Sequence, residues 1–360
     1  MVLTTPMSAP AGPVTQPATN ENARKAGGRA PAYAALDLGT NNCRLLIACP
    51  NRDGFRVVDA FSRIVRLGEG LSQTGRLRED AIERTIGALA VCRDKMRSRG
   101  VHRARLIATE ACRSAENGAR FLADVRERLG MDLEIVDRET EARLAALGCG
   151  ALADPEAKSV VLFDIGGGSS EIVWLCREGE PAARRIDGRR LRAWESLRLG
   201  VVTLAERFGG VEVDSETFEA MIDYVSEELS PFVARVVDEE RCERFHLLGT
   251  SGTVTTIAGV YLDLPRYDRR HVDGLWMSSA AVSATVARLR AMSFAERAAN
   301  ACIGRQRADL VLAGCAILEA IRRRFPAERL RIADRGLREG ILTQLMSEDR
   351  AWRRFGRERA

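Results

Sequence analysis

Residues 161–169 read VLFDIGGGS, and residues 34–42 read AALDLGTNN. Each stretch is an apolar run that ends in an aspartate, Asp37 or Asp164. Each then continues through an apolar residue and a glycine into small polar residues and a second apolar run. Internal repeats of one plan are typical of duplicated structural units. The pair therefore predicts two similar lobes that face one another.

Strand and helix patterns alternate on both sides of these stretches. Short apolar runs predict strands, and apolar residues spaced three or four apart predict helices. In the first half we expect strands at 33–38, 42–49, 54–67, 103–109 and 133–137, and helices at 77–96, 116–129 and 139–152. In the second half we expect a strand, glycine turn and strand over 159–176, a long helix within 213–237 interrupted near Pro231, a strand, turn and helix over 244–262, a helix at 306–324, and a strand leading into a helix over 330–346. This order predicts an α/β fold with a mixed sheet in each half.

The chain divides into a tail and two lobes. Residues 1–30 hold four of the eleven prolines and show no periodic apolar face, which predicts a disordered tail. We expect lobe I over 31–139 and lobe II over 140–333, with the C-terminal helix near 334–346 packing back on lobe I.

The composition excludes several kinds of site. A chain of 360 residues with 46% hydrophobic and 29% charged content is long enough for two globular domains. The three histidines, His102, His246 and His271, match no metal-binding spacing. Nine cysteines without a C-x-x-C pair argue against a zinc ribbon or a disulfide framework. They fit a reducing compartment, so we expect a cytoplasmic protein.

The charge pattern is basic and consists almost wholly of arginine. The formal net charge is +5, and lysine occurs only at 25, 95 and 158. Arginine clusters at 184–198, 322–331 and 350–359 either face solvent or form a track for a polyanion, and charge runs more often face solvent. No apolar run approaches the ~18 residues of a spanning helix, and the N-terminus lacks a targeting pattern. We expect no membrane or nucleic-acid partner.

The glycine turns have the residue types of a phosphate site. A hairpin that turns on glycine exposes consecutive backbone N–H groups, and without a Cβ the main chain approaches an oxyanion closely. The aspartate at each strand end is placed to hold Mg²⁺ beside that anion, directly or through water. A third turn, Gly249–Thr253, opens a helix. A single such turn would more often be structural, whereas matched turns favour phosphate.

Six motifs together resemble the exopolyphosphatase / guanosine pentaphosphate phosphohydrolase (Ppx/GppA) family. They are DLGTNNCRL (37–45), ATEACR (108–113), ETEAR (139–143), DIGGGSSE (164–171), GTSGTVTT (249–256) and DRGLREG (334–340). The resemblance implies two ribonuclease-H-like lobes of the actin, Hsp70 and sugar kinase superfold with a cleft between them. It implies Mg²⁺-dependent removal of the terminal phosphate of inorganic polyphosphate or of pppGpp. Longer members add a C-terminal region of the HD type, so we expect a short form.

The resemblance also assigns roles to individual residues. Glu141 matches the family's catalytic base, and the carboxylates expected near the metal are Asp164, Glu171 and Asp37. The residues that match phosphate-binding positions are Gly39, Thr40, Asn41, Asn42, Arg44, Arg113, Gly166, Gly167, Gly168 and Ser169. Members often carry serine where this chain has Asn42, so an amide replaces a hydroxyl there.

Each assignment has a structural alternative. Glu141, like Glu139, suits a helix N-terminus, where the dipole favours an acid. Asp164 and Glu171 are also typical of a turn cap and a solvated strand residue. Arg113 is equally compatible with a surface ion pair, and Glu110 with a strand-end acid or a supporting role. The 249–253 turn is either a nucleoside contact or a helix N-cap series, and 334–340 is a hinge, a phosphate contact or a plain helix start.

The leading functional hypothesis is release of orthophosphate from polyphosphate by a water molecule that Glu141 activates. The alternative within the class is a pppGpp 5′-phosphohydrolase. Other classes are a small-molecule kinase of the same superfold and a non-catalytic sensor of polyphosphate or alarmone. The partners to consider are therefore polyphosphate and guanosine penta- or tetraphosphate, with a homodimer as the candidate assembly.

Overall fold

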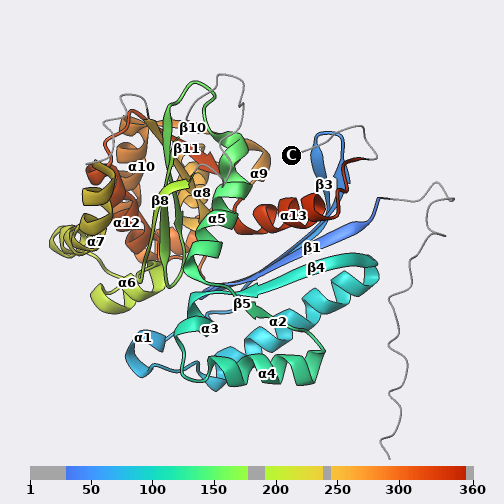
Figure 1. Ribbon diagram of the computed structural model, residues 1–360. Helices are drawn as coiled ribbons and strands as arrows, with labels where there is room; N and C mark the ends of the chain where they lie inside the picture. Colours follow the sequence, from blue (N-terminus) through green and yellow to red (C-terminus); the bar gives the residue numbers. More distant parts are fainter. Residues whose placement is uncertain (1–29, 177–190, 238–244, 354–360) are drawn as a thin grey trace, which may run out of the picture. The chain divides into compact units, whose positions relative to one another are not determined.

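The structure, a computed structural model, describes residues 30–176, 191–237 and 245–353. The predicted tail over 1–30, apart from Ala30, lies outside the described residues, as do 184–190 and 354–359 of the arginine clusters. Two mixed sheets with helices on both faces make up the described chain, which confirms the predicted α/β fold (Figure 1).

The first sheet belongs to lobe I and has the strand order β3-β2-β1-β4-β5. Strands β1, β2 and β3 pair antiparallel, whereas β4 and β5 extend the sheet in parallel from β1. The strand bounds are β1 Ala32–Leu38, β2 Asn42–Asn51, β3 Gly54–Ile64, β4 Val101–Ala108 and β5 Glu134–Ile135.

The second sheet belongs to lobe II and repeats this plan. Its order is β10-β11-β9-β6-β7-β8, in which β6, β7 and β8 pair antiparallel and β9 and β11 continue in parallel. The additional strand β10 pairs antiparallel with β11. The bounds are β6 Ser159–Ile165, β7 Ser170–Cys176, β8 Leu191–Leu197, β9 Phe245–Thr250, β10 Trp276–Ser278 and β11 Arg329–Ala333.

The repeat extends to the pairing of individual residues. Asp37 of β1 lies opposite Arg44 of β2, and Asp164 of β6 lies opposite Glu171 of β7. Both hairpins therefore have the same register and the same glycine turn between their strands. The predicted duplication is confirmed.

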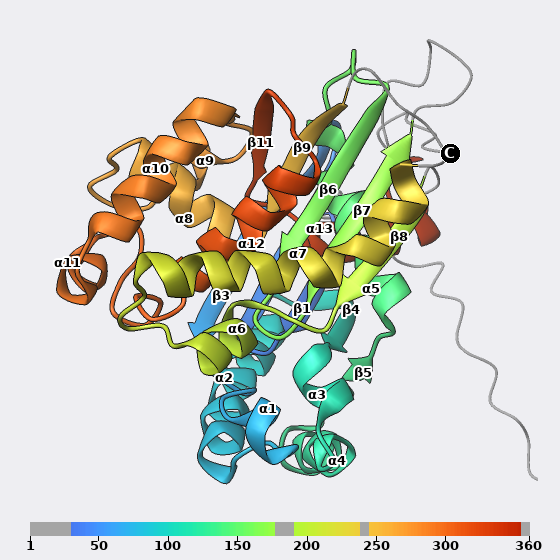
Figure 2. The same cartoon turned by 90° about the vertical axis from the view of Figure 1, so that its left-hand side faces the viewer.

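Helices cover the outer face of each sheet. Because successive strand residues point to opposite faces, Ala34 and Leu36 pack against α2 and α4 of lobe I, while Tyr33 and Ala35 point the other way. In lobe II, α7, α8, α10 and α12 cover the outer face, as Figure 2 shows. The bounds are α1 Leu71–Thr74, α2 Glu79–Ser98, α3 Glu110–Ser114, α4 Gly118–Leu129, α6 Val201–Phe208, α7 Ser215–Val237, α8 Ser251–Tyr261, α9 Arg269–Val272, α10 Ser279–Ala291, α11 Phe294–Ala299 and α12 Val311–Arg324.

Two helices lie on the inner faces of the sheets and contact each other. The helix α5 (Arg138–Cys149) packs on sheet II and continues into the 3₁₀ turn Gly150–Leu152, whereas α13 (Leu337–Glu348) packs on sheet I. They cross at glycines: a Cβ on Gly148 would overlap the carbonyl oxygen of Gly336, and a Cβ on Gly340 would overlap that of Leu144. The lobes therefore contact each other directly through the backbones of α5 and of the segment that begins α13.

Two predicted helices differ from the structure. The interruption predicted near Pro231 was wrong, because α7 runs unbroken through it. Buried Leu229 and Phe232 hold the helix on either side of Pro231. The helix predicted at 306–324 begins only at Val311, after a series of turns.

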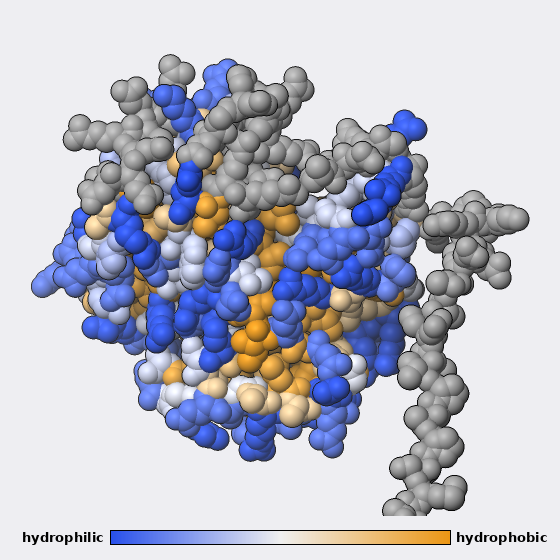
Figure 3. Space-filling model, in the orientation of Figure 1, coloured by the Kyte–Doolittle hydropathy of each residue, from blue (hydrophilic) through white to orange (hydrophobic). Residues whose placement is uncertain are grey.

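Charged side chains cover much of the surface, and an apolar area lies near the middle of the face in Figure 3. The large apolar side chains with substantial exposure among the described residues are Val57, Ile135, Val211 and Tyr261. In the described ranges, no helix combines the length and apolarity needed to cross a bilayer.

Candidate functional site

The two glycine turns meet across the cleft. Each turn closes with the same hydrogen bond, from Gly39 N–H to Asn42 O at 2.9 Å and from Gly166 N–H to Ser169 O at 3.0 Å. A Cβ added to Gly167 would lie 3.0 Å from Thr40 Cβ. The two bends therefore point toward each other, as the sequence repeat predicted.

A neighbouring segment fixes the first turn. The carbonyl of Asn41 accepts bonds from the N–H groups of Val65 at 2.9 Å and Arg66 at 3.1 Å, and the carbonyl of Thr40 accepts from Gly68 at 2.9 Å. These bonds direct the carbonyls of the turn toward lobe I. Within the described part of the chain, the N–H groups of Thr40 and Asn41 donate to no protein acceptor.

The second turn is held by the start of α6. Val201 N–H donates to Gly166 O at 3.0 Å, and Val202 N–H donates to Gly167 O at 2.8 Å. The N–H groups of Gly167 and Gly168 have no acceptor among the described residues. Each turn thus has its carbonyls occupied and a pair of donors left unpaired, which is the property of an anion site.

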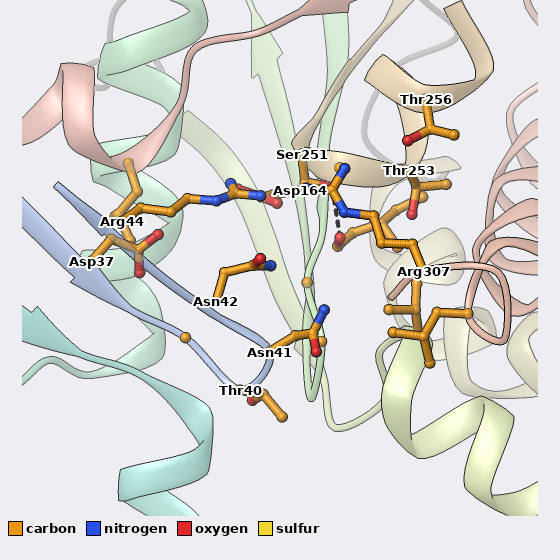
Figure 4. A pocket seen from close by; sticks show the side chains of 18 of the residues that line it. Asp37, Thr40, Asn41, Asn42, Arg44, Asp164, Ser251, Thr253, Thr256 and Arg307 are labelled. Carbon is orange, nitrogen blue, oxygen red and sulfur yellow. Dashed lines mark hydrogen bonds between the residues drawn. The ribbon is translucent and has the colours of Figure 1, made fainter. Parts of the chain in front are cut away.

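A cavity of ≈ 120 Å³ lies between the lobes at these turns (Figure 4). Both turns, the start of α8 and a loop before α12 contribute to its wall. Predicted site residues on the wall are Asp37, Gly39, Thr40, Asn41, Asn42, Arg44, Asp164, Gly166 and Gly167. The buried Oδ1 atoms of Asn41 and Asn42 have no hydrogen-bond partner.

A second cavity of ≈ 640 Å³ adjoins the first, and four residues line both of them. The shared residues are Arg44, Ser251, Gly252 and Arg307. The outer wall of the second cavity includes Tyr267, whose hydroxyl donates to Asp334 Oδ2 at 2.7 Å. A ligand bound at the turns therefore has room to extend past the arginines.

Two aspartates of the cavity resist ionisation. Burial raises the pKa of Asp164 to about 6, with a further contribution from Asp37, although the guanidinium groups of Arg44 and Arg338 oppose this shift. Burial likewise raises the pKa of Asp37, and Arg44 and Arg338 again act in the opposite direction. The two carboxylates are therefore close enough to repel each other, and a cation between them would favour their charged forms.

Three arginines at the cavities lack a partner. In the described ranges, the guanidiniums of Arg44, Arg307 and Arg338 form no hydrogen bond or ion pair with the protein. A Cβ on Gly252 would lie 3.7 Å from Arg307 Nη1 and 3.8 Å from Arg44 Nη2, so these two groups are neighbours. Burial and then the charge of Arg44 lower the pKa of Arg307. Unpaired cations that repel one another fit a bound polyanion.

The candidate base Glu141 lies behind the cavity wall, in the first turn of α5. Its side chain is buried and accepts one hydrogen bond, from Arg113 Nη2 at 3.2 Å. Burial raises the pKa of Glu141 well above its usual value, and the charges of Glu171 and Asp37 raise it further, while Arg113 lowers it. Glu139 instead bonds Arg143 on the half-exposed side of α5.

The remaining predicted residues also lie outside the cavity wall, in contact with the turns or with Glu141. Glu171 is buried, and Ser196 Oγ donates to its Oε1 at 3.0 Å. Burial and the charge of Asp164 raise the pKa of Glu171 to about 7. Gly168 contacts the first turn, because a Cβ added to it would lie 2.5 Å from Thr40 Oγ1. The side chain of Ser169 hydrogen-bonds Glu171.

Polar contacts join the lobes beside the cavity, in a set that we call the clasp. Arg66 Nη2 of lobe I donates to Asp309 Oδ2 at 3.0 Å and to Gln306 O at 3.1 Å. Glu206 of lobe II accepts from Gly70 N–H at 2.7 Å and from Ser72 Oγ. Because the backbone of Arg66 also holds the first turn, the clasp couples the position of that turn to lobe II.

Several residues of the cavity walls were not predicted from the sequence. No sequence pattern marked Arg307 as a site residue, because it lies in a series of turns that resembles the start of a helix. Arg338 belongs to DRGLREG, for which a phosphate contact was one alternative. The capping alternative for the 249–253 turn is not realised at Thr250, because its hydroxyl donates to Arg335 O at 2.6 Å. Ser251 Oγ donates to Ile165 O at 2.6 Å, and Thr253 lines the cavity.

The donor set fits one kind of metal site. Among the residues that the structure describes, no three His, Cys, Asp or Glu side chains gather into a metal cluster. Mg²⁺ usually takes one or two carboxylates and completes its shell with water and substrate phosphate. Asp37 and Asp164 therefore suit a cation shared with a phosphate.

Comparison with known proteins identifies relatives of this chain. "Guanosine-5'-triphosphate,3'-diphosphate pyrophosphatase" of Photobacterium profundum is 29% identical over 328 residues, which make up 89% of this chain and 60% of that protein. "Exopolyphosphatase 2" of Mycobacterium tuberculosis is 31% identical over 329 residues, 87% of this chain and 98% of that protein. This chain thus spans the Mycobacterium protein almost completely but only part of the Photobacterium protein.

Solved structures share the two-lobed fold. A Ppx/GppA family member from Aquifex aeolicus superimposes with a TM-score of 0.72 at 28% identity, over 89% of this chain and 98% of that one. An exopolyphosphatase from Cytophaga hutchinsonii has a TM-score of 0.78 at 23% identity, over 88% and 98% of the two chains. A model of the Ppx/GppA phosphatase family matches residues 46–349, a stretch that includes the second glycine turn, α5 and α13. On this match the chain belongs to the Ppx/GppA phosphatase family.

Proposed function

We propose that this protein hydrolyses the terminal phosphoanhydride bond of inorganic polyphosphate and releases orthophosphate, with Mg²⁺ as cofactor. The observation that carries the proposal is the meeting of two glycine turns beside three arginines, whose N–H groups and guanidiniums find no partner among the described residues. This surface is complementary to a chain of phosphates. The Mycobacterium relative named exopolyphosphatase 2, which matches over 98% of its length, supports the same substrate.

The terminal phosphate binds between the turns. The N–H groups of Thr40, Asn41, Gly167 and Gly168 donate to its oxygens, and Arg44 adds charge. Phosphoryl transfer passes through a loose transition state whose charge spreads over three equatorial oxygens. Donors already fixed by the backbone stabilise that charge without reorganisation.

The metal site consists of Asp37 and Asp164. When bound, Mg²⁺ neutralises charge on the phosphate oxygens. Asp37 and Asp164 would hold the ion, and its charge would favour the ionised form of both carboxylates, whose pKa values burial raises. Glu171, which Ser196 and Ser169 hold, supports this pair from β7.

Glu141 acts as general base. It accepts a proton from the water that attacks the terminal phosphorus in line with the leaving phosphate. A carboxylate with a pKa raised by burial is a stronger base near neutral pH, and such groups typically contribute ~10²–10⁴-fold in rate.

The second candidate function is a pppGpp 5′-phosphohydrolase. The observation that favours it is the second cavity, where the ring of Tyr267 lines a space large enough for a nucleoside. The Photobacterium relative, whose name refers to this nucleotide class, matches over part of its length. Arg305 and Arg307 in the same cavity serve either a phosphate chain or a pyrophosphate.

We further propose a cytoplasmic protein that uses no membrane or nucleic-acid partner. In the described ranges no disulfide joins the cysteines, which supports a reducing compartment. We also predict a homodimer, and sedimentation analysis can test this assembly.

A phosphate-release assay tests the proposal. Wild type and Glu141→Gln are compared on long polyphosphate and on pppGpp, with and without Mg²⁺ and without any acceptor alcohol. We expect acceptor-independent, Mg²⁺-dependent release that the variant lowers about 10²–10⁴-fold with little change in substrate affinity. Release that needs an acceptor indicates a kinase, and an active Glu141→Gln variant excludes this base.

A further inference from the structure

Arg113 is committed to two carboxylates. Its Nε and Nη2 atoms donate to Glu110 Oε2 at 3.1 and 2.6 Å, and Nη2 also donates to Glu141 Oε2 at 3.2 Å. Nη1 donates to the carbonyl of Val136 at 2.6 Å. Every guanidinium nitrogen has a protein acceptor, and Arg113 does not line the cavity. These bonds use four of its five N–H groups, so Arg113 is held mainly by the protein.

Glu110 is the centre of this arrangement. Its side chain is only 8% exposed. Ser114 Oγ donates to its Oε1 at 2.5 Å, and Arg138 Nη2 donates to Oε1 at 3.0 Å and to Oε2 at 3.1 Å. Burial disfavours the charge, but the bonds from Ser114, Arg113 and Arg138 outweigh it and lower the pKa of Glu110. A fixed negative charge therefore lies between α3 and α5.

Glu141 depends on Arg113 for its orientation. Among the described residues, Arg113 is the only side chain that donates a hydrogen bond to Glu141. Arg138 lies one helical turn before Glu141 on α5, so Glu110 holds both the start of this helix and the arginine that touches the base.

We propose that Glu110 is a positioning residue for hydrolysis, because it holds Arg113 against Glu141 and so keeps the base in one orientation. The inference rests on the proposed function, in which Glu141 activates water. It follows that Arg113 serves the base, although its motif resembles a phosphate-binding one. Loss of either residue lowers turnover and leaves substrate affinity nearly unchanged.

The arrangement requires an acceptor with negative charge at position 110. In Glu110→Gln, an amide NH₂ replaces one carboxylate oxygen and faces the donors of Arg113, Arg138 and Ser114. Arg113 then loses its anchor and Glu141 loses a fixed partner. Glu110→Asp keeps the charge with a shorter reach, so it restores part of the function.

The experiment compares kcat and KM for phosphate release from polyphosphate. We expect Glu110→Gln to lower kcat about 10²-fold, the cost of a small misplacement of a reacting group, with KM nearly constant. Glu319→Gln is the matched control, since Glu319 and Arg322 form an i,i+3 pair of similar burial in α12, away from the cavity. Its kcat should remain near that of wild type.

A double mutant separates positioning from a general loss of structure. In a Glu141→Gln background, adding Glu110→Gln should cause no further fall in kcat, because the group through which it acts is already gone. A multiplicative loss in that background overturns the inference. A raised KM with unchanged kcat in Glu110→Gln also overturns it, and assigns Arg113 to the phosphate.

A milder variant covers the case in which Glu110→Gln does not fold. Ser114→Ala removes one hydrogen bond from Glu110 and leaves its charge in place, so kcat should fall less and KM should stay constant. An unchanged kcat in a folded Ser114→Ala contradicts the inference, and so does an unchanged kcat in a folded Glu110→Gln. Failure of the proposed function is a separate result: the wild-type protein then releases no phosphate from polyphosphate or pppGpp.

Discussion

Gly168→Ala tests whether the two glycine turns are in contact. A Cβ at this position would lie 2.5 Å from Thr40 Oγ1 and 3.3 Å from Thr40 Cβ and Cγ2. Favourable separations are about 3.5–4.0 Å, so the methyl group overlaps the threonine by roughly 1 Å. Gly168 has no left-handed backbone angle, so alanine fits its backbone and the contact alone determines the effect.

The overlap has no local remedy. Thr40 is 4% exposed, and its Cγ2 packs closely against Gly68, where an added Cβ would lie 2.3 Å away, so its side chain has little room to turn aside. The turns must therefore move apart by about the overlap. Overpacking of this kind costs about 1–3 kcal/mol, and displacement of a reacting group by 1 Å lowers kcat/KM about 10²-fold.

The assay is phosphate release together with thermal unfolding. Gly87→Ala is the control, because a Cβ at Gly87 in α2 meets no atom within 4 Å. It should leave activity unchanged and stabilise the helix by up to ~1 kcal/mol. Thr40→Ala combined with Gly168→Ala should recover part of the activity that Gly168→Ala loses. Full activity and unchanged stability of Gly168→Ala would refute the contact.

Three further predictions concern charge. The pKa of Asp164 in the folded protein, about 6, exceeds its ordinary 3.8, so the free energy of unfolding falls as the pH rises between these values. In metal-free buffer near pH 8, Asp164→Asn should therefore raise the free energy of unfolding by up to about 3 kcal/mol and abolish activity. An equal or lower stability would contradict the buried charge. Arg307→Ala should weaken polyphosphate binding about tenfold with a smaller salt dependence, while calorimetry of the ligand-free protein shows no loss of stability. Arg66→Ala removes the arginine of the clasp, so X-ray scattering should report a larger radius of gyration. Asp309→Asn should have the same effect. An unchanged radius of gyration in both variants would show that the clasp does not hold the lobes together.

Local sequence predicted the hairpins and about half of the residues in the wall of the first cavity. Asp37 and Asp164 could be placed because each ends a short apolar strand before a glycine, and such a turn has few conformations. The same applies to the loop amides, Asn41 and Asn42. Strand pairing then follows from the duplication, and the observed register agrees with it.

Long-range contacts could not be predicted in the same way. Arg307 reaches the cavity from a loop that carries no periodic pattern, and its neighbour Arg44 comes from the other lobe. The partners of Arg113 were likewise undetermined, because one of them, Glu141, comes from α5, 28 residues further along the chain. Pro231 shows the reverse case, in which buried neighbours override a local rule about proline.

The equivalent positions opposite the two aspartates carry opposite signs. Arg44 stands across from Asp37 in one hairpin, whereas Glu171 stands across from Asp164 in the other. The first hairpin thus pairs its aspartate with a cationic side chain, whereas the second pairs its aspartate with another carboxylate. A phosphate accompanied by its metal satisfies both halves at once, while either ion alone satisfies only one. The exchange of arginine for glutamate at this one pair therefore suits the site to a phosphate and its metal together.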